Sequence, residues 1–140
     1  MKDPQKKKVY AWEDSWWGWN RSTVSYLECQ RVIRRACRLF KVKPPIVIEH
    51  SGRRYSEYDP ETDTISMRSE KELNIPISLH EATHAIIWKL YGEKVQDHGP
   101  EFVGVYLWLL AEFQVAPAAA IFPSAETAGL EWVLTPPMGR

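Results

Sequence analysis

The stretch His80-Glu81-Ala82-Thr83-His84, followed by His98-Gly99-Pro100-Glu101-Phe102, decides the kind of fold this chain adopts. The first segment has the pattern H-E-x-x-H, which on a helix brings two imidazoles to one metal ion with a carboxylate beside them. The 140-residue chain has 4 histidines, and all but His50 lie in these two segments. The pattern therefore predicts a metal centre built around one helix.

The residues that flank the motif predict a helix over residues 77–91. Pro76 stands at a position suited to the first turn of a helix, and Gly92 stands where a helix would end. No Pro or Gly interrupts the segment, and most of its residues are apolar, which is typical of a buried central helix.

The spacing within the motif explains the choice of residues. His80 and His84 lie about 40° apart around a helix axis and one turn apart along it, so both imidazoles can reach one ion. Glu81 lies about 100° from His80, on the flank of the same site. At that position it is too far round to be a natural ligand but can accept a proton from an attacking water.

A catalytic zinc takes three protein ligands and keeps one position open. His98 is the favoured third ligand because it precedes Gly99-Pro100, a turn that leads into a second helix. A ligand on that turn is held rigidly and can face the first helix. Glu101 is an alternative ligand, as are Asp97 and Glu93.

The two motif segments resemble those of the SprT-like metallopeptidases, which include the Spartan-type proteases that act on DNA-bound proteins. The resemblance extends over residues 22–113 and suggests a minimal version of the kind that a bacteriophage encodes. It implies zinc bound by His80, His84 and His98, with Glu81 as the general base. The implied enzyme is a zinc metalloendopeptidase, a hydrolase with a protein or peptide substrate.

The expected fold class is α+β and zincin-like: an N-terminal helix, a short antiparallel sheet, the H-E-x-x-H helix, and a supporting helix that carries the third ligand on its preceding turn. Residues 1–21 are expected to form a basic, Trp-rich arm, residues 22–115 the metallopeptidase domain, and residues 116–140 an extended Pro-rich tail. The N-terminal helix is predicted over residues 22–40, with Ser25 in a capping box, and the supporting helix from Pro100 to about Phe113.

Short strands are predicted between the first two helices of this domain. Ile46-Val47-Ile48 is expected to be a buried strand, and residues 53–58 and 63–67 are expected to pair as a hairpin around Asp59-Pro60-Glu61-Thr62. In zinc peptidases an edge strand beside the metal helix binds an extended peptide by strand addition. The strand over residues 64–67 is the expected edge.

The sequence also leaves open the role of the N-terminal tryptophans and the identity of the oxyanion donor. Trp12, Trp16 and Trp19 stand at i, i+4 and i+7, a spacing that favours a stripe packed on the core over a surface that stacks bases or a lid over the cleft. Peptide hydrolysis also needs a donor to the oxyanion. The candidates that the sequence offers are Tyr106, Tyr91, His50 and Arg53.

The composition suits one small domain, with 44% hydrophobic residues and 18 basic against 18 acidic residues. A net charge of zero gives no global attraction to nucleic acid. Lysines at residues 2–8 and a basic cluster over residues 31–43 leave DNA association as a candidate, although a solvated helix face is the more common reason for such a cluster.

The cysteines and the apolar segments bear on the compartment. Cys29 and Cys37 stand eight positions apart on a predicted helix and cannot bridge each other there. Unpaired cysteines, the lack of an apolar signal region and the lack of a membrane-spanning run favour the cytoplasm, which is the host cytoplasm if the protein is phage-encoded.

Two other functions are compatible with the same residues. One is a regulatory peptidase that cleaves a repressor and uses Glu101 as its third ligand. The other is a non-enzymatic module in which zinc is a structural staple and the basic clusters and tryptophans bind nucleic acid. A structural zinc site normally has four protein ligands, so the number of ligands distinguishes this module from an enzyme.

Overall fold

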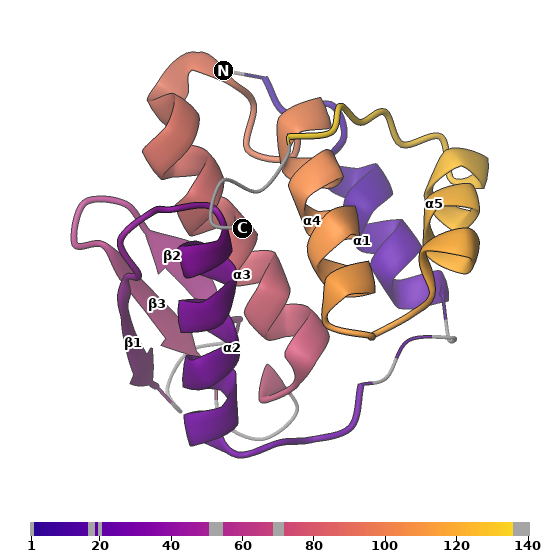
Figure 1. Ribbon diagram of the computed structural model, residues 1–140. Helices are drawn as coiled ribbons and strands as arrows, with labels where there is room; N and C mark the ends of the chain where they lie inside the picture. The colour runs from indigo at the N-terminus through magenta and orange to yellow at the C-terminus, as the bar shows by residue number, and fades with distance from the viewer. Residues whose placement is uncertain (1, 17–18, 20, 51–54, 69–71, 136–140) are drawn as a thin grey trace.

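The computed structural model describes residues 2–16, 19, 21–50, 55–68 and 72–135. Within these residues the chain is a small α+β domain, as predicted, with a three-stranded sheet at one side of the helices (Figure 1). Its elements are α1 (Lys6–Ser15), α2 (Tyr26–Leu39), β1 (Ile46–Glu49), β2 (Glu57–Asp59), β3 (Thr64–Met67), α3 (Ile75–Tyr91), the 3-10 turn η2 (Gly92–Lys94), α4 (Pro100–Glu112) and α5 (Ala118–Thr127).

Helix α3 is the central element, with the sheet and α2 on one side and α4 on the other (Figure 1). Its N-terminus is capped by Asn74, whose side-chain oxygen accepts a hydrogen bond of 2.8 Å from the backbone N–H of Ile77. Pro76 lies in its first turn, and Gly92 ends it with a φ of +61°. The predicted helix over residues 77–91 is therefore confirmed, with its start two residues earlier.

The sheet has the order β1-β3-β2, which corrects two predictions. Strand β2 pairs with β3 as the expected antiparallel hairpin, but β1 pairs with β3 in parallel, with Val47 opposite Ile65. The sheet is therefore mixed rather than antiparallel. The strand Thr64–Met67 is central rather than an edge, because β1 takes the side of β3 that β2 leaves open. The edges are β1 and β2.

Strand β1 is also less buried than predicted. Val47 is buried, but the side chains on either side of it are exposed, by 63% at Ile46 and 38% at Ile48. This alternation is what an edge strand with one face on the core produces.

Helix α2 begins at Tyr26 because Ser25 accepts a hydrogen bond of 3.0 Å from the backbone N–H of Glu28. The helix is shorter than the predicted span of residues 22–40. Its inward face buries Ile33 and both cysteines, which are free thiols. Burial raises the pKa of Cys37 to about 12.

The chain on both sides of the predicted domain packs onto it. Trp12 and Trp19 are buried and make edge-on ring contacts with Tyr106 of α4, so the prediction of a core stripe is confirmed for these two. The prediction of an extended tail is wrong over residues 118–127, which form α5 and bury Ile121. Pro117 stands at the start of this helix, and the alanines that follow favour it.

The segment that follows α5 lies against α4 at Gly104. A Cβ built on Gly104 would stand 1.8 Å from the carbonyl oxygen of Val133, so only glycine fits this close approach of two backbones. The backbone N–H of Val133 donates a hydrogen bond of 3.1 Å to the carbonyl of Pro100. Among the described residues, every helix is too short or too polar to cross a bilayer.

Candidate metal centre

Three imidazoles converge where α3 meets the turn before α4. His80 and His84 come from successive turns of α3, and His98 comes from the turn. One ring nitrogen of each histidine lies within 4.8 Å of the others. The Nε2 atoms of His80 and His84 are 3.2 Å apart. The structure thus brings the three histidines predicted from sequence to one point.

The chemistry of this cluster fits a metal ion. The Nε2 atom of His98 is buried and has no hydrogen-bond partner among the described residues. A buried polar atom without a partner is costly, and a metal at this point would satisfy it. Burial lowers the pKa of His84 well below its ordinary value and also lowers that of His98, so both rings are neutral, as metal ligands must be.

The acidic alternatives for the third ligand do not join the cluster. In the part of the chain that the structure describes, the group of potential ligands at this point holds His80, His84 and His98 without a carboxylate. Glu101 lies in the first turn of α4, where it suits the positive end of the helix dipole. Three imidazoles suit zinc and leave a fourth position open.

His80 is oriented by a carboxylate from α1. Its Nδ1 atom lies 2.7 Å from Oε2 of Glu13, and the hydroxyl of Tyr106 donates a hydrogen bond of 2.6 Å to the same oxygen. Because Nδ1 is engaged there, Nε2 is the nitrogen that faces His84. Burial alone would lower the pKa of His80, but the charge and hydrogen bond of Glu13 raise it to about 9.

His98 is held by residues that precede α1. Its Nδ1 atom lies 2.7 Å from Oδ2 of Asp3, and its backbone N–H donates a hydrogen bond of 3.0 Å to Oδ1 of the same carboxylate. The side chain of Gln5 donates to the His98 carbonyl at 3.1 Å. Carboxylates that bind the outer nitrogen of a ligand histidine fix its orientation and increase its basicity.

Glu81 lies beside the cluster in the position expected of a general base. It is buried, with 7% of its surface exposed, yet it lines the cavities on both sides of the site. Burial and the nearby charge of Glu13 raise its pKa to about 7, against the opposing effects of His80 and of the Tyr58 backbone N–H. A carboxylate with a pKa near neutrality can both accept and return a proton.

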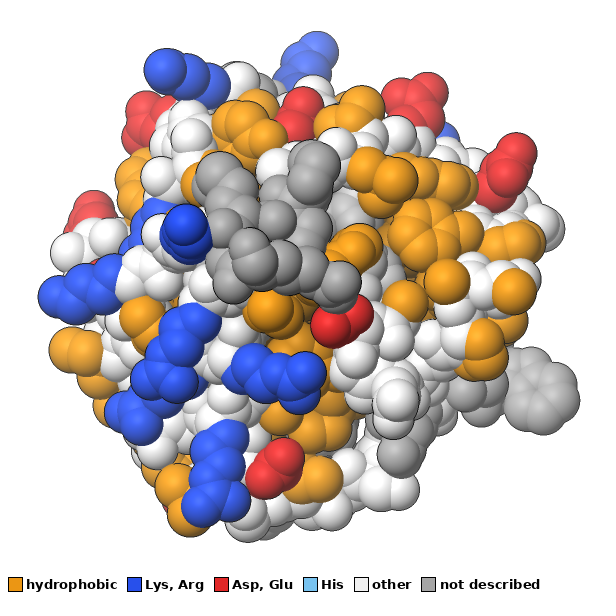
Figure 2. Space-filling model, viewed as in Figure 1, with side chains coloured by type: hydrophobic (Ala, Val, Ile, Leu, Met, Phe, Trp, Pro, Cys, Tyr) orange, Lys and Arg blue, Asp and Glu red, His pale blue; other side chains and the backbone are white. Residues whose placement is uncertain are grey.

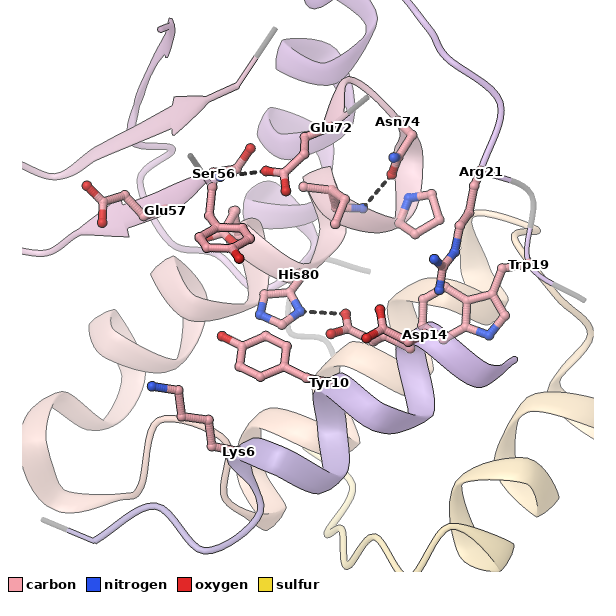
Figure 3. Close-up of a pocket in the computed structure, with 15 residues that line it drawn as sticks. Lys6, Tyr10, Asp14, Trp19, Arg21, Ser56, Glu57, Glu72, Asn74 and His80 are labelled. Atoms are coloured by element: carbon pink, nitrogen blue, oxygen red, sulfur yellow. Dashed lines mark hydrogen bonds and ion pairs between the residues drawn. The ribbon is translucent and has the colours of Figure 1, made fainter. Parts of the chain in front are cut away.

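Two cavities of about 640 and 310 Å³ meet at this site. Figure 3 shows the larger one, with His80 at its floor, Tyr10 on the α1 side and Glu57 on the sheet side. Both cavities are lined by Ser56 and Glu57. The edge strand beside the metal helix is therefore β2, in place of the strand predicted from sequence.

Three of the four oxyanion donors suggested by the sequence, Tyr106, Tyr91 and His50, are not among the residues that line these cavities. Tyr106 is 1% exposed and donates its hydroxyl to Glu13. Tyr91 shares a hydrogen bond of 3.1 Å with the Thr135 hydroxyl. His50 follows β1, and its backbone bonds to Met67 of β3. The fourth candidate, Arg53, lies outside the described residues.

Sequence reasoning did not identify Asp3, Glu13 or Tyr10 as site residues. Asp3 is 95 positions from His98, and Glu13 is 67 positions from His80, so no local spacing connects them. The available signal was weak: two carboxylates on an N-terminal segment that also carries a core stripe of tryptophans.

No family model, curated protein or solved structure matches this chain. The resemblance to SprT-like metallopeptidases therefore rests on the residues of the two motif segments.

Proposed function

We propose that this protein is a zinc-dependent metallopeptidase of the SprT-like type, with a zincin-like arrangement of α3 and α4. The observation that carries the proposal is the buried, unpartnered Nε2 of His98, which lies with His80 and His84 at a point beside Glu81. Three imidazole donors, one open position and an adjacent carboxylate are the parts that metal-assisted hydrolysis requires.

A zinc ion held by the three histidines would polarise the scissile carbonyl and acidify the attacking water. Glu81 accepts a proton from that water as the water oxygen adds to the carbonyl carbon. Glu81 then returns the proton to the amine as the C–N bond breaks. Glu13 and Asp3 keep His80 and His98 in the orientation that binds the metal.

The substrate is an extended segment of protein or peptide. Strand β2 lies at the edge of the sheet and its first residue, Glu57, lines both cavities, which supports pairing of a substrate strand along it. We expect the protein to work in the reducing cytoplasm, because Cys29 and Cys37 are free thiols.

We also propose that this protein associates with DNA. Basic side chains gather over the outer face of α2 and the turn after it (Figure 2). The exposed members are Arg31, Arg34, Arg35, Arg38, Lys41 and Lys43. Such a face attracts phosphates through charge, and binding to it would weaken as salt rises.

The decisive experiment compares wild type with Glu81→Gln on a panel of protein substrates, with and without DNA. Gln has the shape of Glu but cannot accept the proton, so hydrolysis should fall by about 10²–10⁴-fold while zinc content stays the same. Glu126→Gln is a matched control, because Glu126 is exposed on α5. Elemental analysis should find about one zinc per chain.

Each alternative has its own outcome in this experiment. Full turnover in Glu81→Gln would place the base elsewhere. A protein without stoichiometric transition metal would contradict the proposal altogether. Stable zinc with no open coordination position would favour the non-enzymatic module.

A further inference from the structure

Peptide hydrolysis places negative charge on the carbonyl oxygen, and a preorganised hydrogen-bond donor at that point is a large contribution to rate. Two of the tyrosines considered from the sequence are engaged elsewhere. The hydroxyl of Tyr106 donates a hydrogen bond to Glu13, and the hydroxyl of Tyr91 shares one with the hydroxyl of Thr135. A donor on this chain must face the open side of the three-histidine cluster.

Tyr10 of α1 is a donor side chain beside the cluster. Its ring stacks on that of His80, with ring centroids 5.9 Å apart and planes 10° from parallel. It also meets the ring of His98 edge-on, with centroids 5.3 Å apart. Tyr10 lines both cavities, and 42% of it is exposed, so a substrate in the site would contact it.

The direction of the phenol suits the role. In Figure 3 the Tyr10 ring lies beneath His80, and its hydroxyl points to the side opposite the dashed bond that His80 makes through Nδ1. That is the side of Nε2, the nitrogen that faces His84. No hydrogen bond engages the Tyr10 hydroxyl within the described residues, in contrast to the hydroxyls of Tyr26, Tyr58, Tyr91 and Tyr106.

We propose that the Tyr10 hydroxyl donates the hydrogen bond that stabilises the substrate's carbonyl oxygen during hydrolysis. The role rests on the proposed peptidase function. As the water oxygen adds to the carbonyl carbon, its proton moves to Glu81 and the carbonyl oxygen becomes negative. Tyr10 donates to that oxygen and keeps its own proton throughout. When the C–N bond breaks, Glu81 supplies the proton to the leaving amine.

The segment around α1 contributes several residues to the site. Asp3, which precedes α1, and Glu13, near the end of α1, orient two of the proposed metal ligands. Tyr10 lies between them in the chain and faces the substrate. Gln5 fastens this segment by accepting from the backbone N–H of Glu131 at 2.6 Å and donating to the His98 carbonyl. The donor is thereby held by the same element that shapes the metal centre.

The test uses the full chain loaded with cobalt(II) in place of zinc, because the visible spectrum of cobalt reports its ligands. Acetohydroxamate is the probe, since it binds an open metal position with an anionic oxygen that mimics the charged carbonyl oxygen. Tyr10→Phe should retain one cobalt per chain and bind acetohydroxamate about 10- to 100-fold more weakly, the size of a lost hydrogen bond to a charged group. Tyr91→Phe is a matched control, because it removes a hydroxyl that is hydrogen-bonded to Thr135. This variant should bind acetohydroxamate as wild type does.

On any protein substrate that wild type cleaves, Tyr10→Phe should lower kcat by about 10²–10³-fold, with less effect on KM. Equal acetohydroxamate affinity in wild type and Tyr10→Phe would overturn the role of Tyr10 and leave the peptidase proposal standing. Loss of cobalt from Tyr10→Phe would also overturn it, since Tyr10 would then be a ligand. Failure of the wild-type cobalt protein to bind acetohydroxamate would show that the metal has no open position, and both proposals would fall.

Discussion

The Nδ1 atom of His80 lies 2.7 Å from Oε2 of Glu13, although the two residues are 67 positions apart. This contact ties the N-terminal helix to the metal helix. Glu13 is 7% exposed and its pKa is lowered, because the charge and hydrogen bond of His80 and the hydrogen bond of Tyr106 outweigh the opposing effect of burial. A buried carboxylate in this position is stable only while the histidine and the tyrosine satisfy it.

Glu13→Gln should weaken zinc binding by about 10- to 100-fold, as is typical when an outer partner of a ligand histidine is removed. The amide can still accept a hydrogen bond, but it no longer supplies the charge that makes the imidazole a strong donor. Zinc titration against a competing chelator measures the change. Asp14→Asn, at an exposed carboxylate on the same helix, should leave the affinity unchanged. Equal losses in both variants would mean that general charge, rather than this contact, sets the affinity.

His98→Ala should lower zinc affinity and thermal stability together. A metal bound only by the folded state stabilises it by about 2.7 kcal/mol at a hundredfold excess over the dissociation constant, and loss of a ligand raises that constant. Glu101→Ala should cost only the dipole contribution of about 0.3–1 kcal/mol. Melting with and without chelator separates the two variants. If Glu101→Ala lost zinc and His98→Ala retained it, the third ligand would be the carboxylate.

Zinc binding should depend on the proton that His80 carries in the metal-free protein. Its pKa is raised from 6.5 to about 9, so near neutral pH the ring is protonated and the metal must displace that proton. Zinc affinity should therefore rise as pH increases toward about 9. The folding stability of the metal-free protein should change with pH in the opposite direction. The stabilising ion pair between His80 and Glu13 is fully present below pH 6.5 and is lost as pH rises through about 9.

Calorimetry in buffers with different heats of ionisation counts the protons that zinc releases. Near neutral pH, wild type should release about one proton more than Glu13→Gln, whose His80 lacks the partner that raises its pKa. The difference should disappear above pH 9 or so. The same release from both proteins near neutrality would show that Glu13 does not control the protonation of His80.

Gly104→Ala should destabilise the protein by about 1–3 kcal/mol, the usual cost of overpacking a close contact. The new Cβ would stand 1.8 Å from the Val133 carbonyl oxygen, so the segment from Leu130 to Thr135 would have to move. Chemical denaturation measures the change. In a chain shortened after residue 131 the same substitution should be neutral or stabilising, because Ala favours a helix over Gly by about 1 kcal/mol. Destabilisation of the shortened chain by Gly104→Ala would place the clash elsewhere.

The features that depend on local spacing are predictable from the sequence. A helix over residues 77–91 is predictable from Pro76, from Gly92 and from an uninterrupted apolar run, and the observed helix begins two residues earlier, at Ile75. The placement of His80 and His84 on one face follows from the helical repeat. The place of His98 in the cluster is predictable because a turn with Gly99-Pro100 restricts where its side chain can lie, and its role as a metal ligand stays a prediction. These inferences need only a few neighbouring residues, so the chain alone is sufficient for them.

Contacts between distant segments follow from the packing of the folded chain and are not predictable from local spacing. Strand β1 pairs with the side of β3 that β2 leaves open and makes β3 central, so the edges of the sheet are β1 and β2. The segment around α1 places Asp3, Tyr10 and Glu13 against the histidines, because burial of Trp12 and Trp19 against α4 brings that segment across the site. Such contacts depend on the packing of the whole core, and no periodicity in the sequence records them.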